Sequence, residues 1–160
     1  MPEIRIRHAT PLDVPIILTF IRELAEYEKL AHAVVATDDD LHVALFGDRP
    51  VIEAVIAAKD DEPVGYALFF PTFSTFLGKP GMYLEDVYVR PAARGLGIGR
   101  KLLEHLARIT VQRGWGRLEW SVLDWNEPSI SFYKKMGATP MDEWTIYRLA
   151  GKALQQLAGS

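Results

Sequence analysis

The sequence predicts a mixed α/β protein, and three features carry that prediction. Short stretches such as residues 3–9 and 51–59 alternate apolar and polar residues or are β-rich, which is typical of strands. Longer stretches repeat apolar residues at helical spacing. The two patterns follow one another as β-α-α-β-β-β-α-β-α-β. We therefore expect a central mixed sheet with an antiparallel meander and flanking helices, in one domain over residues 1–160.

The first elements of the chain are a strand and two helices. Residues 3–9 alternate as a strand does. Thr10 and Asp13 are candidate helix caps, each with a proline close behind, and the helix that follows extends to about Glu28. A second, short helix begins after Thr37, has acidic residues in its first turn and ends at Gly47.

Three strands form the middle of the chain. Residues 51–59 and 63–73 are β-rich, and the turn sequence DDEP joins them into a predicted hairpin. Residues 82–89, MYLEDVYV, are the next strand in this series.

The second half alternates helices and strands. A helix begins near Ile98 and stops at Gly114, and residues 117–123 are a strand. The next helix has Asn126 as its cap and Gly137 just after its end. Residues 144–149, WTIYRL, are predicted as the last strand, before a helical tail over 151–160.

Composition excludes several classes of function. The net charge of −3 argues against a nucleic-acid partner, because such proteins usually carry a basic surface. The absence of cysteine excludes disulfides, thiolate metal sites and a cysteine nucleophile. The histidines lack metal-ligand spacing, so we expect no metal and assign them surface or packing roles. No secretory signal or membrane-spanning run is visible, so we expect a soluble cytoplasmic protein.

The stretch RGLGIG, residues 94–99, is the strongest chemical signal. It lies between a predicted strand and a predicted helix, where free backbone N–H groups and the positive end of the helix dipole bind phosphate. Glycines let a pyrophosphate approach those amides, and Arg94 and Arg100 add positive charge. The alternative is a glycine-rich turn without a ligand. Neither the Walker loop, which needs Gly-Lys-Ser/Thr, nor the dinucleotide fingerprint GxGxxG fits this spacing.

The residues Arg94 to Gly99 match the R/Q-x-x-G-x-G/A motif of the GNAT acetyltransferases. The sequence further resembles the diamine/spermidine N-acetyltransferase family, particularly its thialysine N-epsilon-acetyltransferase branch. The blocks that carry this resemblance are RELAEYEKL, YLEDVYV, RGLGIG and LDWNEPSISFYKKMGA, within residues 22–138. Similarity is weaker in HAVVA and in the C-terminal tail.

The resemblance implies an acetyl-CoA-dependent enzyme, a homodimer, and a role for each residue that matches the family. Tyr133 matches the tyrosine that protonates the leaving thiolate, and Glu85 matches the acid beside the incoming amine. The expected cofactor-binding residues are Val87, Tyr88, Val89, Arg94, Gly95, Leu96, Gly97, Ile98, Gly99, Arg100, Asn126, Glu127, Pro128 and Ser129. The expected acceptor-binding residues are Tyr27, Glu28, Glu85, Glu119, Trp120 and Ser121.

The chemistry is consistent with these residue types. A primary amine attacks a thioester only after losing a proton, and near pH 7 it is almost entirely ammonium. Carboxylates can collect the cation and help remove its proton. A tyrosine has a pKa suited to protonating a thiolate, and backbone N–H groups can stabilise the oxyanion.

Each candidate also has a purely structural interpretation. Tyr133 has the spacing of a core aromatic residue. Glu85 lies in an apolar strand, so it is either at an exposed edge or in a pocket, and we expect the pocket. Strand alternation places Asp86 on the opposite face, as a structural hydrogen-bond acceptor. Glu28 is either an acceptor ligand or a solvated charge, and Trp120 either lines the acceptor site or packs.

One departure from the family concerns the acceptor. The polyamine-preferring members carry an acid in the loop after the third strand, where this chain has Ser74. This favours a small amine, such as thialysine or a short diamine, over spermidine or spermine. Two alternatives stay open: a GNAT enzyme that acetylates a protein N-terminus or lysine, and an acyl-CoA-binding sensor without turnover.

Overall fold

A computed structural model describes residues 1–159 of the chain. Contacts divide these residues into two compact units, Met1–Ser121 and the segment from Val122 onward. The first unit contains the sheet and three α-helices, and the second contains two α-helices. Because each unit is described by itself, the single-domain organisation stays a prediction.

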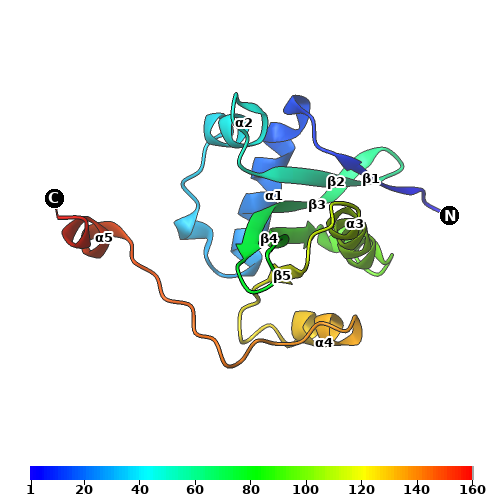
Figure 1. Cartoon of the computed structure of the whole chain (residues 1–160). Helices are drawn as coiled ribbons and strands as arrows, with labels where there is room; N and C mark the ends of the chain where they lie inside the picture. The colour runs from blue at the N-terminus through cyan, green and yellow to red at the C-terminus, as the bar shows by residue number, and fades with distance from the viewer. Residues whose placement is uncertain (160) are drawn as a thin grey trace. The chain divides into compact units, whose positions relative to one another are not determined.

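The first unit is built on a five-stranded sheet in the order β1-β2-β3-β4-β5 (Figure 1). The four N-terminal strands pair antiparallel, and β5 pairs parallel to β4 after the crossover through α3. The predicted mixed sheet with its antiparallel meander is therefore confirmed. The strands are β1 (Ile4–His8), β2 (Glu53–Lys59), β3 (Glu62–Ser74), β4 (Lys79–Val89) and β5 (Leu118–Trp120).

Helices cover both faces of this sheet (Figure 1). Helices α1 (Val14–Tyr27) and α2 (Asp38–Phe46) pack on one face, and α3 (Ile98–Gln112) covers the other, where the Thr110 hydroxyl lies 3.6 Å from the Met82 sulfur. Short 3₁₀ turns at Pro11–Asp13, Ala31–Ala33 and Pro91–Ala93 complete the unit.

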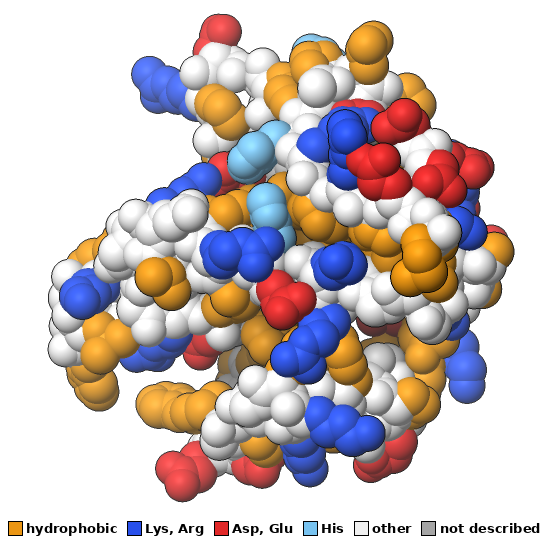
Figure 2. All heavy atoms as spheres, turned by 90° about the vertical axis from the view of Figure 1, so that its right-hand side faces the viewer, with side chains coloured by type: hydrophobic (Ala, Val, Ile, Leu, Met, Phe, Trp, Pro, Cys, Tyr) orange, Lys and Arg blue, Asp and Glu red, His pale blue; other side chains and the backbone are white. Residues whose placement is uncertain are grey.

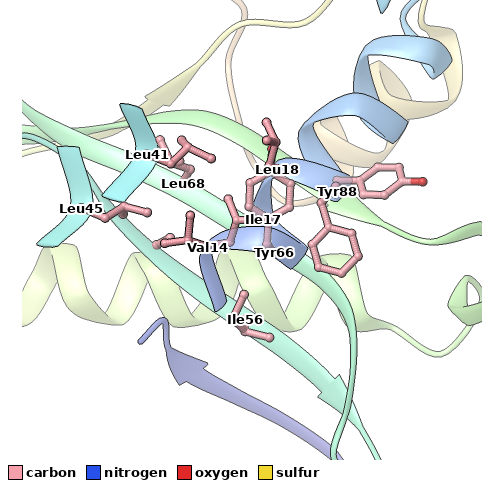
Figure 3. Close-up of a cluster of buried hydrophobic side chains, with 11 residues drawn as sticks. Val14, Ile17, Leu18, Leu41, Leu45, Ile56, Tyr66, Leu68 and Tyr88 are labelled. Carbon is pink, nitrogen blue, oxygen red and sulfur yellow. The ribbon is translucent and has the colours of Figure 1, made fainter. Parts of the chain in front are cut away.

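The core on the α1 and α2 face joins both helices to the strands (Figure 3). Burial of such apolar surface is the main favourable term in folding. The buried cluster consists of Val14, Ile17, Leu18, Phe20, Leu41, Leu45, Ala54, Ile56, Tyr66, Leu68 and Tyr88.

Local signals in the sequence set the ends of these elements. The Thr37 hydroxyl accepts a hydrogen bond from the Asp40 amide at 3.2 Å, and the Asp40 carboxylate accepts one from the Thr37 amide at 3.0 Å. This reciprocal capping box begins α2 where predicted. Asp60 and Asp61 adopt positive φ angles of 49° and 67°, as the tight turn of the β2–β3 hairpin requires.

A β-bulge interrupts the pairing of β3 with β4. Leu68 lies opposite Asp86 and Phe69 lies opposite Leu84, so Glu85 has no residue directly across from it. An extra residue in one strand shifts the alternation of side chains and bends that strand. The bulge thus lies at the glutamate that the sequence singles out.

The second unit contains α4 (Glu127–Lys135) and α5 (Gly151–Leu157). The buried Asn126 side chain caps α4 by accepting a hydrogen bond from the Ser129 amide at 3.4 Å. At the other end, Gly137 has a φ of 92° and its amide bonds to the Lys134 carbonyl. Both predicted boundaries of this helix are confirmed.

The prediction of a strand over residues 144–149 is wrong. The structure assigns these residues neither strand nor helix, although the helical tail after them is present. Trp144, Ile146 and Tyr147 are 72%, 79% and 91% exposed. Strand composition alone does not make a strand, because its N–H and C=O groups need a neighbouring strand.

Candidate active site

The glycine loop opens α3 in the conformation that only glycine adopts easily. Gly95 and Gly97 have φ angles of 84° and 76°, and Gly97 is the N-cap of α3. Among the described residues, nothing lies within 4 Å of a Cβ built on either glycine, so conformation rather than crowding requires them. The loop therefore presents the N–H groups of the first turn of α3 as an anion-binding site.

The backbone of β4 provides a second set of hydrogen-bonding groups. The last residue pair between β4 and β5 is Leu84 with Trp120, while β4 continues to Val89. The Arg90 amide donates a hydrogen bond to the Val64 carbonyl at 2.8 Å. In an antiparallel pair every second residue forms such backbone bonds with the same neighbouring strand, so the backbone groups of Tyr88 and Asp86 also face β3. The backbone groups of Val87 and Val89 consequently point toward the other edge, beyond the end of β5.

Arg94 connects the glycine loop to the end of α1. Its Nε donates to the Val89 carbonyl at 3.2 Å, and its guanidinium carbon lies 5.4 Å from the centre of the Tyr27 ring. This distance is within the range of a cation–π contact. The predicted phosphate-binding loop and the predicted acceptor residue Tyr27 therefore lie next to each other.

Three carboxylates, those of Glu28, Glu85 and Asp86, interact electrostatically near the end of α1. Burial, followed by the charges of Asp86 and Glu85, raises the pKa of Glu28, which is half-buried. Burial and the charge of Asp86 likewise raise the pKa of Glu85, although its side chain reaches solvent at the bulge. Mutual repulsion of this kind favours binding of a cation and makes a carboxylate a stronger base.

Asp86 belongs to the same acidic cluster. Both Glu85 and Asp86 interact electrostatically with Glu28, and the bulge lies at Glu85. The predicted role of Asp86 as a hydrogen-bond acceptor is confirmed, because it accepts a 2.7 Å bond from the Tyr66 hydroxyl. Burial raises the pKa of Asp86 and the Tyr66 bond lowers it, with a net rise.

A neighbouring network fixes Tyr88, whose backbone is a predicted cofactor contact. Its hydroxyl donates to Glu23 at 2.9 Å, and Glu23 also pairs with Arg90 at 3.1 Å. Burial and the Glu23 bond raise the pKa of Tyr88 to about 12, so this tyrosine stays protonated and structural at neutral pH. The arrangement ties α1 to the end of β4.

The predicted acceptor residues of β5 lie beside the middle of β4. In the parallel register Glu119 lies opposite Tyr83 and Trp120 opposite Leu84, one residue before Glu85. The Ser121 hydroxyl lies 2.6 Å from the Tyr83 hydroxyl. The β5 residues therefore lie beside the part of β4 that leads to Glu85.

The remaining predicted residues belong to the second unit. Asn126 is 5% exposed and caps α4, so it has a structural role whatever else it contacts. Glu127, Pro128 and Ser129 form the first turn of this helix. Tyr133 lies near its end, half-buried, with its ring 5.7 Å from that of Phe132. The placement of these residues against the glycine loop stays a prediction.

Two contacts of the site were not anticipated from the sequence. Tyr66 looks like an ordinary aromatic residue of a strand, and nothing local indicates its bond to a residue 20 positions away. Ser74 is held by Arg117, whose Nη2 donates to the serine hydroxyl at 2.9 Å. Pairing across strands decides both contacts, and a single sequence shows pairing only indirectly.

Outside the site, the surface is mixed in charge. Figure 2 shows Lys and Arg side chains interspersed with Asp and Glu on the face that it presents. The His8 and His105 rings are 6.3 Å apart, and burial lowers the pKa of His105, which fits a packing role. Within residues 1–159, no helix is both long and apolar enough to span a membrane.

Comparison with known proteins agrees with this geometry. Residues 19–138 match the acetyltransferase (GNAT) family model. The chain is 37% identical to the thialysine N-epsilon-acetyltransferase of Mus musculus, with 99% of both chains covered. It is 35% identical to the L-ornithine N5-acetyltransferase of Arabidopsis thaliana, covering 96% of this chain and 87% of that one.

A solved structure agrees in fold as well. An integron cassette protein of V. cholerae is 28% identical, covers 98% of both chains and superposes with a TM-score of 0.81. The family match spans most of the chain and includes the glycine loop, the acidic cluster and Tyr133. The chain belongs to the GNAT acetyltransferase family, and it is an acetyltransferase.

Proposed function

We propose that this protein is an acetyl-CoA-dependent N-acetyltransferase that acts on a small primary amine. The observation that carries the proposal is the adjacency of an anion-binding glycine loop and a cluster of three carboxylates within one unit. Arg94 joins them, since it begins the loop and lies over Tyr27, the neighbour of Glu28. The glycine loop suits a pyrophosphate, and the carboxylate cluster suits an ammonium group.

The first unit offers a fitting site for acetyl-CoA. The amides from Gly95 to Arg100 would hold the pyrophosphate, and the open space at Gly95 and Gly97 admits it. The backbone groups of Val87 and Val89 would hold the pantetheine arm much as a neighbouring strand would. The same N–H groups would stabilise the oxyanion that forms when the amine attacks the thioester carbonyl.

The acidic cluster would bind and activate the acceptor. Glu28, Glu85 and Asp86 attract the ammonium group, and Glu85 removes a proton from it directly or through water. The raised pKa of Glu85 makes it a better base near neutral pH. The C–N bond then forms, the C–S bond breaks, and the thiolate takes a proton from Tyr133. This direct transfer needs no covalent enzyme intermediate and fits a chain without cysteine.

The relatives narrow the acceptor class. Two of them are named for acetylation of the side-chain amine of a cationic amino acid, thialysine or ornithine. The Ser74–Arg117 contact adds a local argument, because Ser74 stands where polyamine-preferring members have an acid, and it accepts a hydrogen bond from a cationic guanidinium. We therefore propose thialysine, ornithine or a short diamine as the acceptor class, ahead of spermine.

We further propose that the protein acts as a homodimer, as its resemblance implies. The exposed residues 144–149 support this, because they have strand composition and no strand partner among the described residues. Strand β5 lies at the edge of its sheet. An exposed edge and an unpaired strand-like segment favour association with a second copy. Sedimentation of the intact protein and of a chain with Ile146→Lys would test this, since only the substitution should yield monomer.

An acceptor panel with release of the coenzyme A thiol as the readout tests the proposed function. The panel contains thialysine, ornithine, a short diamine, spermidine, spermine, a peptide with a free N-terminus and a lysine peptide. We expect the highest kcat/KM with a small amine. Preference for either peptide would favour the protein-acetylating alternative. Tight acetyl-CoA binding without thiol release from any acceptor would favour the sensor.

A further inference from the structure

Tyr66 places a hydroxyl group in the apolar core, at a position where the ring of a phenylalanine would pack equally well. The residue is 0% exposed, and its ring stacks on Phe20 at 5.6 Å with an interplanar angle of 16°. A buried hydroxyl costs free energy unless it finds a partner. Its hydrogen bond runs 2.7 Å to Asp86 Oδ2.

The surroundings of Asp86 determine what this bond does. The titratable groups that interact with the Asp86 carboxyl are Glu85 on the same strand, Glu28 at the end of α1 and Tyr66 on β3. The two glutamates repel an ionised Asp86, and burial disfavours it further. The Tyr66 hydroxyl acts in the opposite direction, because a hydrogen-bond donor stabilises the ionised carboxylate.

The position of Asp86 in the strand adds a geometric reason. The bulge lies at Glu85, next to Asp86, where it disrupts the ladder and bends the strand, and both carboxylates interact with Glu28. Tyr66 is held by the stacking on Phe20, and Phe20 in turn packs against Tyr88 at 6.0 Å. A packed donor on the neighbouring strand therefore holds a carboxylate that lies next to the bulge.

Resting on the proposed acetylation of a cationic amine, we propose that Tyr66 is a positioning residue of the acceptor site. Its hydroxyl holds the Asp86 carboxylate ionised and oriented beside Glu28 and Glu85, so that this carboxylate contributes to binding the acceptor ammonium. Tyr66 itself does not touch the acceptor. Its contribution to acceptor binding depends entirely on Asp86. The Tyr66 hydroxyl should therefore affect acceptor affinity only while Asp86 is present.

The experiment compares wild type, Tyr66→Phe, Asp86→Asn and the double variant, with Thr110→Val as the control. Thr110 on α3 is buried and its hydroxyl donates to the Leu106 carbonyl at 2.8 Å, so its variant removes a buried hydroxyl outside the acidic cluster. For each protein, kcat and KM for ornithine and the Kd of acetyl-CoA are measured from pH 6 to 9. Calorimetric binding of ornithine provides a readout that is independent of turnover.

We expect Tyr66→Phe to raise the KM and the calorimetric Kd for ornithine about tenfold at pH 7, the usual scale for a hydrogen bond to a charged group. Without the bond, the pKa of Asp86 rises, so the acidic limb of kcat/KM should move to higher pH. The Kd of acetyl-CoA and the kcat above pH 8 should change less than twofold. In the Asp86→Asn background the second substitution should have no further effect.

Two results would overturn the inference. One is an unchanged pH profile and ornithine affinity in a folded Tyr66→Phe variant. The other is full additivity of Tyr66→Phe and Asp86→Asn. If Tyr66→Phe does not fold, an unchanged pH profile in Asp86→Asn would overturn it instead. Failure of the proposed function is distinguishable, since wild type would then acetylate no small amine in the same assay.

Discussion

Arg117 donates a 2.9 Å hydrogen bond to the hydroxyl of Ser74, and the Leu77 amide donates a second one at 3.1 Å. The place where polyamine-preferring members have an acid is therefore occupied by a serine that is already held by a cation. An aspartate introduced there would keep both donors and pair with the guanidinium. Changing the serine alone leaves the local charge nearly neutral.

The acceptor preference should therefore respond to two substitutions together. We expect Ser74→Asp to shift the ratio of kcat/KM for spermine over ornithine less than about threefold, because Arg117 neutralises the new charge. Ser74→Asp with Arg117→Gln should shift it roughly tenfold, since one freed carboxylate contributes about 1–2 kcal/mol. Steady-state kinetics on both amines measure the ratio. A full shift from Ser74→Asp alone, or a wild type that prefers spermine, would contradict this account.

The glycine loop gives a prediction on the cofactor. Gly97→Glu should abolish acetyl-CoA binding, because the side chain and its charge would enter the anion site. The φ angle of 76° makes any L side chain strained there, by roughly 1–2 kcal/mol. Gly97→Ala is thus the matched control, and it should lower the melting temperature similarly while retaining measurable affinity. Calorimetry that shows equal affinity for wild type and Gly97→Glu would place the pyrophosphate elsewhere.

In the acidic cluster, we predict that ionised Glu28 lowers the stability of the fold and strengthens acceptor binding. Because the folded-state pKa of Glu28 is raised, the folded state holds its proton to higher pH than the unfolded chain. Its ionised form therefore destabilises the fold at neutral pH, and the cost disappears as pH falls below the ordinary value of 4.5. Glu28→Gln should raise the melting temperature at pH 8, with the gain vanishing near pH 4.

The same substitution should weaken acceptor binding, so KM for ornithine should rise while the Kd of acetyl-CoA stays constant. Glu26→Gln is the control, because Glu26 is an exposed carboxylate on the same helix. It should change neither the melting temperature nor KM. A lower melting temperature for Glu28→Gln at pH 8, together with an unchanged KM, would make Glu28 an ordinary structural charge.

Tyr133 gives the prediction on the chemical step. Tyr133→Phe removes the proton donor and keeps the ring that packs near Phe132. Acetyl-CoA affinity should fall only modestly, since one hydrogen bond contributes about 1 kcal/mol. Single-turnover acetyl transfer should slow by roughly 10²–10⁴, the range for general acid catalysis. Near wild-type single-turnover rates would leave Tyr133 with a packing role and assign the proton to water.

The sequence predicted those parts of the fold that local signals determine. The Thr37 capping box, the turn at Asp60 and Asp61, and the Gly137 helix end depend on a few neighbouring residues, and the structure confirms each. The strand over 144–149 also has a clear local pattern, but it requires a partner strand. Its prediction failed because pairing is not a local property.

The candidate site also has a part that local sequence predicts and a part that depends on contacts between distant residues. Alternating glycines before a helix predict the anion site directly, and Gly95 and Gly97 have the required backbone conformation. The acidic cluster depends on the bulge at Glu85 and on the end of α1, which lies far away in the sequence. Strand alternation therefore did not reveal the interaction of Asp86 with Glu28, and nothing in the sequence linked Tyr66 to Asp86.

Identification of the acetylated product tests the central claim most directly. Wild type, Gly97→Glu and Tyr133→Phe are incubated with acetyl-CoA and either thialysine or ornithine, and the products are identified by mass spectrometry and NMR. We predict one acetyl group on the side-chain nitrogen, formed by wild type in amounts equal to the thiol released. Neither variant should form it at a comparable rate. Thiol release without an N-acetylated amine, or no transfer to any small amine, would contradict the account.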